Sequence, residues 1–152
     1  MPVKVISSRH NDPVKQFSIF TPNRLGRLHD LLDLLRSRDV HVLALSVLDT
    51  TDSAIIRVVV DDPEQARDLF RKHSFPFTES VLVVVEVESV ERLNMLMDAM
   101  LEAELNINYL YSFIPQPQGR SVLAMSLEDN ELAEQILATH QFRVLRQIDI
   151  SR

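Results

Sequence analysis

The same pattern of apolar residues occurs twice along this chain of 152 residues, at a nearly fixed offset. Leucines spaced i, i+3, i+4 and i+7 predict an amphipathic helix from Leu28, and the pattern returns 65 residues later from Leu93. A second helical pattern at 66–70 returns after 67 residues at 133–137, because the second copy has a hairpin two residues longer. A repeat at fixed spacing indicates a duplicated supersecondary unit, which constrains the architecture more than any other feature here.

Each copy contains the pattern strand, helix, strand, strand, helix, strand. Runs rich in β-branched residues and bounded by turn residues predict the strands. Asp62 followed by Pro63 predicts the start of the second helix, with a capping side chain and a proline at the first helical position. The expected strands of the first copy are 14–20, 42–48, 54–60 and 81–87. This order predicts an α+β fold of two ferredoxin-like βαββαβ units, with antiparallel sheets and the helices on one face.

The repeat also predicts the domain boundaries. We expect an N-terminal segment at 1–12, one unit at 13–80 and a second unit at 81–152. The strand at 81–87 matches both the first strand and, through Ile148 and Ile150, the expected last strand. It is therefore expected to be shared by the two units, with no linker between them.

The expected strands are apolar on both faces, for example AIIRVVV at 54–60. A sheet with helices on one face and water on the other should alternate apolar and polar residues. We therefore expect a homodimer formed through the sheets or their edges.

Composition excludes several classes of function. The chain has no cysteine and only two glycines, so thiol chemistry and glycine-rich phosphate loops are excluded. Acidic residues outnumber basic ones by 22 to 16, which disfavours a nucleic-acid partner. No apolar run is long enough for a membrane span or a signal peptide, so a cytoplasmic location is expected. We find no nucleophile with a base and no paired histidines, and we expect no catalytic residue, no metal and no cofactor.

One glycine marks the strongest motif. The segment Asn23-Arg24-Leu25-Gly26-Arg27-Leu28 joins the first strand to the first helix, and His41-Val42 opens the next strand. In the second copy, Asn106-Ile107 stands at the position of His41-Val42. This ordered series resembles the ACT domain family, whose pattern is a strand, Asn-x-Pro-Gly-x-Leu, a helix and an Asn-Ile pair.

The resemblance implies a non-catalytic regulatory protein that binds a small amino acid or related metabolite at an interface between units. A helix start offers unpaired N–H groups and partial positive charge to a carboxylate. Gly26 would let the ligand approach the backbone. The implied ligand-binding residues are Asn23, Arg24, Leu25, Gly26, Arg27 and His41, with Asn106, Asn108 and Tyr111 completing the pocket from a neighbouring unit.

The sequence departs from the family pattern at several positions. Leu25 replaces the proline before the glycine, and His41 replaces the asparagine. In the second copy, Glu88 and Glu91 stand where Asn23 and Gly26 stand in the first. Carboxylates there would repel a ligand carboxylate, so we expect the first loop to be the working site.

Several alternatives stay open at this point. Asn23 can be a helix cap, Arg24 and Arg27 can be solvated surface charges, and Tyr111 can belong to a protein interface. As a whole, the protein can be the regulatory subunit of a biosynthetic enzyme such as acetolactate synthase. It can also be a dimerisation module without a ligand.

Overall fold

The computed structural model describes residues 11–22, 25–114 and 120–151. The chain divides into two compact units, which we call the N-terminal unit (15–80, with which Ser151 groups) and the C-terminal unit (81–150, with which 11–14 group). Gly119, which the sequence places in a hairpin turn, lies outside the described residues.

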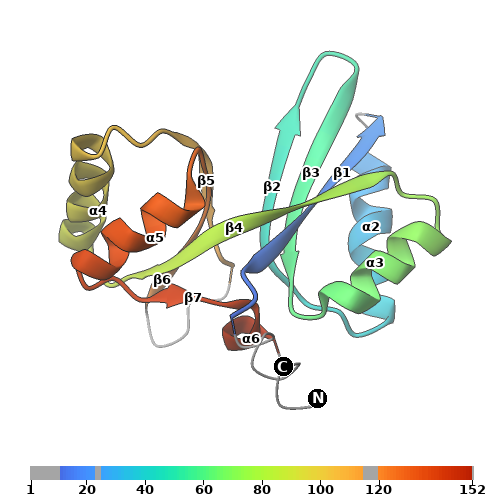
Figure 1. The fold of residues 1–152 in the computed structure, drawn as a ribbon. Helices are drawn as coiled ribbons and strands as arrows, with labels where there is room; N and C mark the ends of the chain where they lie inside the picture. The colour runs from blue at the N-terminus through green and yellow to red at the C-terminus, as the bar shows by residue number, and fades with distance from the viewer. Residues whose placement is uncertain (1–10, 23–24, 115–119, 152) are drawn as a thin grey trace. The chain divides into compact units, whose positions relative to one another are not determined.

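The N-terminal unit has two helices over a four-stranded sheet (Figure 1). The strands lie in the order β2-β3-β1-β4, and β3 pairs antiparallel with both β1 and β2. Beside β1, the N–H of Phe20 donates to the carbonyl of Pro76 at 3.0 Å. The elements of this unit are β1 (Val14–Pro22), α2 (Leu25–Ser37), β2 (Val42–Asp49), β3 (Ser53–Val60), α3 (Pro63–Lys72) and the start of β4 (Phe77–Val87).

The C-terminal unit repeats this arrangement with strands in the order β7-β4-β6-β5. Residues Val83–Val87 of β4 pair with β6, so β4 is the fourth strand of one unit and the first strand of the next. The further elements are α4 (Val90–Glu102), β5 (Ile107–Ser112), β6 (Ser121–Leu127), α5 (Asn130–Thr139), β7 (Val144–Leu145) and α6 (Gln147–Ile150). The α+β fold of two ferredoxin-like βαββαβ units is confirmed.

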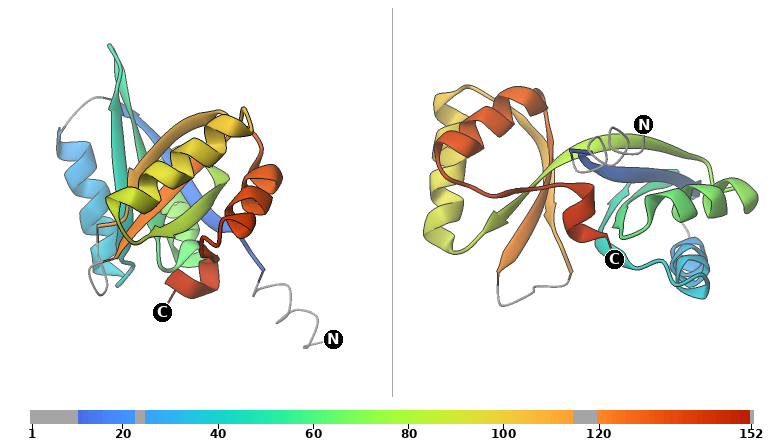
Figure 2. Two further views of the ribbon diagram at one scale, coloured as in Figure 1. Left: turned by 90° about the vertical axis from the view of Figure 1, so that its left-hand side faces the viewer. Right: turned by 60° about the horizontal axis from the view of Figure 1, so that its bottom comes forward.

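In each unit the two helices lie on one face of the sheet (Figure 2). Each unit has its own apolar core. In the N-terminal unit the rings of Phe17 and Phe70 meet edge to face, with centroids 5.3 Å apart. In the C-terminal unit Leu137 stands at the position of Phe70, and its core also contains Met100 and Met125. The helix residues that the periodicity assigned to the core, such as Leu31, Leu35, Leu96 and Met100, are buried.

The expected last strand is wrong in position. Ile148 and Ile150 lie in the short helix α6, and the closing strand β7 is only Val144–Leu145. The carboxylate of Asp149 accepts from the N–H of Arg146 at 2.7 Å, and the N–H of Asp149 donates to the carbonyl of Arg146 at 3.0 Å. These two bonds close a turn and end the strand.

The four long helices that the structure describes end in the same way, and none of them has glycine at its C-terminal end. At each end one residue has a φ of 53° to 63°, and the next residue donates its N–H to a carbonyl in the last turn at 2.9 to 3.0 Å. This is the Schellman motif. The residues with positive φ are Asp39, Ser74, Glu104 and Gln141. The buried residues that follow them are Val40, Phe75, Leu105 and Phe142.

An ion pair joins the second helix of each unit to its last strand or to the residue that follows that strand, and the acidic and basic partners are exchanged between the two units. In the N-terminal unit Arg67 of α3 makes two hydrogen bonds to Glu79, at 2.6 and 2.8 Å. These bonds lower the pKa of the Glu79 carboxyl and raise the pKa of Arg67. At the matching positions of the C-terminal unit, Glu134 lies on the helix and pairs with Arg146.

Glycine at the positive-φ positions should stabilise the protein. We expect Ser74→Gly and Gln141→Gly each to raise the free energy of unfolding by about 0.5–1 kcal/mol, because side chains disfavour this backbone region. Urea unfolding of the full chain measures the change. Ala103→Gly is the matched control, because φ at Ala103 is −83° and glycine there should destabilise. A loss of stability in the two glycine variants would contradict the assignment.

The Arg67–Glu79 pair should make stability depend on pH. A carboxyl whose pKa is lowered in the folded state adds stability above its ordinary value of about 4.3, and this is lost as the pH falls through the folded pKa. Glu79→Gln should therefore cost about 0.5–1.5 kcal/mol at neutral pH, and much less at about pH 3. Urea midpoints at both pH values test this, with Asp52→Asn in the exposed turn as control. An equal cost at both pH values would contradict it.

Candidate functional site

The start of α2 is the centre of the candidate site. Gly26 is the second residue of this helix and is exposed, and a Cβ built on it would have no neighbour within 4 Å. The first turn, Leu25–Leu28, contains no acidic residue. A helix start of this kind has N–H groups without intrahelical partners and the positive end of the helix dipole. The expected ligand residues Asn23 and Arg24, and the side chain of Leu25, lie outside the described residues.

The matching start of α4 is already occupied by its own side chains. The Oγ of Ser89 accepts from the N–H of Arg92 at 3.2 Å, and Glu91 lies in the first turn. This cap satisfies one donor, and the carboxylate neutralises part of the dipole. Ser89 stands at the position of Arg24, and the sequence reasoning missed it. The offset of 65 could have found it, because serine is a preferred cap.

Arg27 has a partner within its own unit. Its guanidinium lies 4.3 Å from the centroid of the Phe75 ring, and Arg92 lies 3.9 Å from the Phe142 ring at the matching positions. A shallow hollow of about 360 Å³ adjoins Arg27 between α2 and the end of α3. It is lined by Arg27, Asp30, Asp33, Leu34, Ser37, His73 and Phe75.

His41 lies at the opposite end of α2 from Gly26. The helix between them rises by roughly 16 Å, so within this unit the two residues cannot contact the same small ligand. The backbone N–H of His41 donates to Asp61 Oδ1 at 2.8 Å, and His41 Nδ1 lies 2.9 Å from Asp61 Oδ2. The Asp61 side chain is only 3% exposed. The neighbouring Asp62 caps α3, as the sequence predicts, so the two adjacent carboxylates have different partners.

Asn106 makes the equivalent contact in the C-terminal unit. Its Nδ2 donates to Glu128 Oε2 at 3.0 Å, and Glu128 stands at the position of Asp61. In each unit the backbone N–H of the acidic residue also donates to the carbonyl of its partner, at 3.1 Å. The expected ligand residues His41 and Asn106 therefore both fasten the start of their strand to the loop before the second helix.

Asn108 and Tyr111 lie on β5 of the C-terminal unit. The strand register shifts between Ile107 and Tyr109, as it does between Val42 and Ala44 of β2. Asn108 Nδ2 donates to Ser126 Oγ at 3.4 Å. The rings of Tyr109 and Tyr111 are stacked, with centroids 6.3 Å apart. Both tyrosines follow the register of Ser126 and Ala124, which places them on the sheet face away from the helices.

Two other features are absent from the described part of the chain. Among residues 11–22, 25–114 and 120–151, no group of three or more His, Asp or Glu side chains could hold a metal ion. None of the helices described is long and apolar enough to cross a membrane.

Comparison with known proteins relates both units to a single family model. A model described as an ACT domain pair matches residues 13–152. The crystal structure of protein BT0572 from Bacteroides thetaiotaomicron has a TM-score of 0.83 at 22% identity, over 92% of this chain and 96% of that chain. The sequence matches no curated protein.

Two regulatory subunits of aspartate kinase share the fold. The ligand-free subunit from Thermus thermophilus has a TM-score of 0.60 at 13% identity, over 84% of this chain and 91% of that chain. The subunit from Thermus flavus has a TM-score of 0.60 at 15% identity, over 86% of this chain and 93% of that chain.

Loss of the buried Asp61 carboxylate should lower the free energy of unfolding more than loss of the exposed Glu128 carboxylate. We expect Asp61→Ala to lower the free energy of unfolding by about 1–3 kcal/mol, because it leaves the His41 N–H without its acceptor. The matched variant Glu128→Ala removes an exposed carboxylate and should cost less than about 1 kcal/mol. Urea unfolding of both variants measures the difference. Equal costs would show that the Asp61 bonds add nothing to the fold.

Proposed function

The chain belongs to the ACT domain family as an ACT domain pair, and from this we propose that it is a non-catalytic regulatory protein that senses a small amino acid or related metabolite. ACT domains are regulatory modules that bind such ligands. The proposed ligand site is the start of α2, with its backbone N–H groups as the receptor for the ligand carboxylate.

The observation that carries this proposal is the open backbone at Gly26. Among the described residues nothing lies within 4 Å of a Cβ built there, so the space beside the backbone at Gly26 is open to a ligand. The carboxylate of an amino acid is the anion that a helix start of this polarity favours. Arg27, held over Phe75, adds a cation one residue further along the chain.

The contrast with α4 supports the N-terminal unit as the working half. There the Ser89 side chain occupies a helix-start donor and Glu91 brings a negative charge to the same turn. A ligand carboxylate would meet both a filled donor and a like charge. The expectation that Asn106, Asn108 and Tyr111 complete the site stays a prediction, as does the homodimer.

A second form of the same proposal is that this chain regulates a separate partner enzyme. Solved structures that share the fold include separate regulatory subunits of an enzyme, aspartate kinase. Regulation of a biosynthetic enzyme by this chain is therefore a testable extension, for which co-purification with a catalytic partner is the measurement. The sequence alternative of a dimerisation module predicts no ligand at all.

A thermal-shift screen of the twenty amino acids on the full chain tests the ligand site. A ligand at one hundred times its dissociation constant should add about 2.7 kcal/mol of stability. Gly26→Val should abolish that shift, because the side chain fills the space above the backbone. It should leave the unliganded melting temperature intact, because valine is a better helix former than glycine.

The matched control is Glu91→Val, which changes the equivalent residue of α4 and should keep the full shift. A Gly26→Val protein that still responds would move the site elsewhere in the chain. No response to any amino acid in the unchanged protein would favour the dimerisation module.

A further inference from the structure

The outward face of α4 carries two parallel rows of side chains. Residues three, four and seven apart share one face of a helix. The apolar row is Val90, Met97 and Leu101, with Asn94 between them, and the acidic row is Glu91, Asp98 and Glu102. We call these two rows together the α4 face.

The apolar row is unusually exposed. Val90 is 71% exposed and Leu101 is 77% exposed, the two highest values among the large apolar side chains described. Met97 is partly buried and packs against the core, so the row continues from the core to the surface. Contiguous apolar side chains rimmed by charge are typical of an interaction surface.

The fold itself does not require this face. At the matching positions of α2, Leu25 and Leu32 stand in place of Val90 and Met97. The differences are Arg36 in place of Leu101, and Gly26 and Ser37 in place of Glu91 and Glu102. Asp33, the counterpart of Asp98, pairs with Arg36 on its own helix. Since the same βαββαβ unit forms without a leucine at the position of Leu101 and without carboxylates at the positions of Glu91 and Glu102, the packing of the unit does not account for these three side chains on α4.

The C-terminal unit also has a large excess of acidic over basic residues. Residues 81–150 contain eleven acidic and four basic residues, whereas 15–80 contain ten and nine. All four basic residues are engaged away from the α4 face. Arg92 donates to the carbonyls of His140 and Gln141, Arg120 and Arg143 pair with Glu86, and Arg146 pairs with Glu134.

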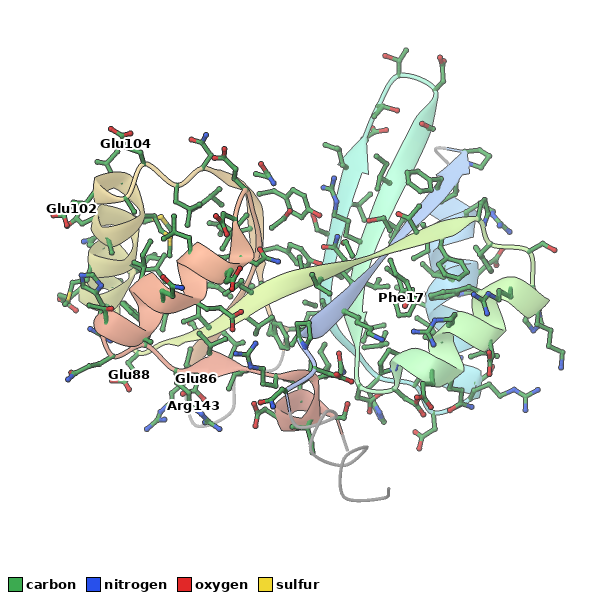
Figure 3. All side chains as sticks on the ribbon, viewed as in Figure 1. Phe17, Glu86, Glu88, Glu102, Glu104 and Arg143 are labelled. Carbon is green, nitrogen blue, oxygen red and sulfur yellow. The ribbon has the colours of Figure 1, made fainter. Side chains whose placement is uncertain are left out.

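None of these four basic residues therefore neutralises the acidic row. Within the described residues no ion pair reaches Glu91, Asp98 or Glu102. Figure 3 shows Glu102 and Glu104 at one end of α4 and Glu88 at the other, while Arg143 lies beside Glu86 on another element. A negative field over an exposed apolar row attracts a surface that is apolar and basic.

We propose that the α4 face is a docking surface for a partner protein, which it binds through a basic amphipathic helix. Leucine-type side chains of the partner would cover Val90 and Leu101, and its Lys or Arg row would lie along Asp98 and Glu102. A second copy does not fit the same face, because two acidic rows would meet. An anionic membrane surface is disfavoured by the same charges. The proposal is independent of the ligand site on α2.

The test uses a labelled Leu/Lys peptide of about 18 residues, long enough to form a helix, with its leucines on one face. Fluorescence anisotropy with the full chain should show binding that weakens as salt is added. A scrambled peptide of the same composition should bind at least about tenfold more weakly, a loss of about 1.4 kcal/mol. In amide NMR spectra the shift changes should be confined to α4 and its neighbours in the C-terminal unit.

Two variants and one control separate the proposal from general attraction between charges. Val90→Ser with Leu101→Ser, and Asp98→Asn with Glu102→Gln, should each weaken binding about tenfold. Both pairs are exposed, so the melting temperature should not fall. Asp30→Asn with Asp33→Asn removes the same charge from α2 and should leave binding unchanged.

Three results would overturn the proposal. One is equal binding of the scrambled peptide, and another is equal loss of binding in the α2 control. The third comes from sedimentation velocity: a dimer of the unchanged chain that Val90→Ser with Leu101→Ser dissociates would assign the face to a second copy.

Discussion

The return of the chain from each helix to its sheet is the constraint on which both units depend. Four times, a residue with positive φ turns the backbone, and the next residue is apolar and buried beneath the helix. These turns fix where the following strand or loop begins, and so they set which side chains face the core. Because none of the four positions is glycine, the buried residue that follows must offset the backbone cost at each one.

A contact found at matching positions of both units indicates that its residues stabilise the shared fold. Arg27 over Phe75 recurs as Arg92 over Phe142, and the bond between His41 and Asp61 recurs between Asn106 and Glu128. Features present in one unit alone, such as Gly26 and the α4 face, are where the two halves differ, and both proposals of a function rest on them. The duplicated chain thus provides its own internal comparison.

The sequence predicted the fold well because periodicity and repetition are local signals. The helices around Leu31 and Leu96, and the cap at Asp62, follow from spacing and side-chain chemistry. The closing strand was misplaced because Ile148 and Ile150 have the spacing of a strand, whereas the carboxylate of Asp149 accepts from the N–H of Arg146 and the segment forms a helical turn. Partners such as Asp61 for His41 are twenty residues apart, and only the folded chain brings them together.

The reversed ion pair has a consequence for how a duplicated chain avoids folding incorrectly. Tandem units of like sequence can exchange equivalent strands during folding. In such a hybrid, α3 would meet the last strand of the other unit and Arg67 would face Arg146. Glu134 would likewise face Glu79. Each hybrid would place like charges together, whereas each native unit pairs opposite charges. The exchanged positions of acid and base would therefore disfavour a strand exchange between the two units.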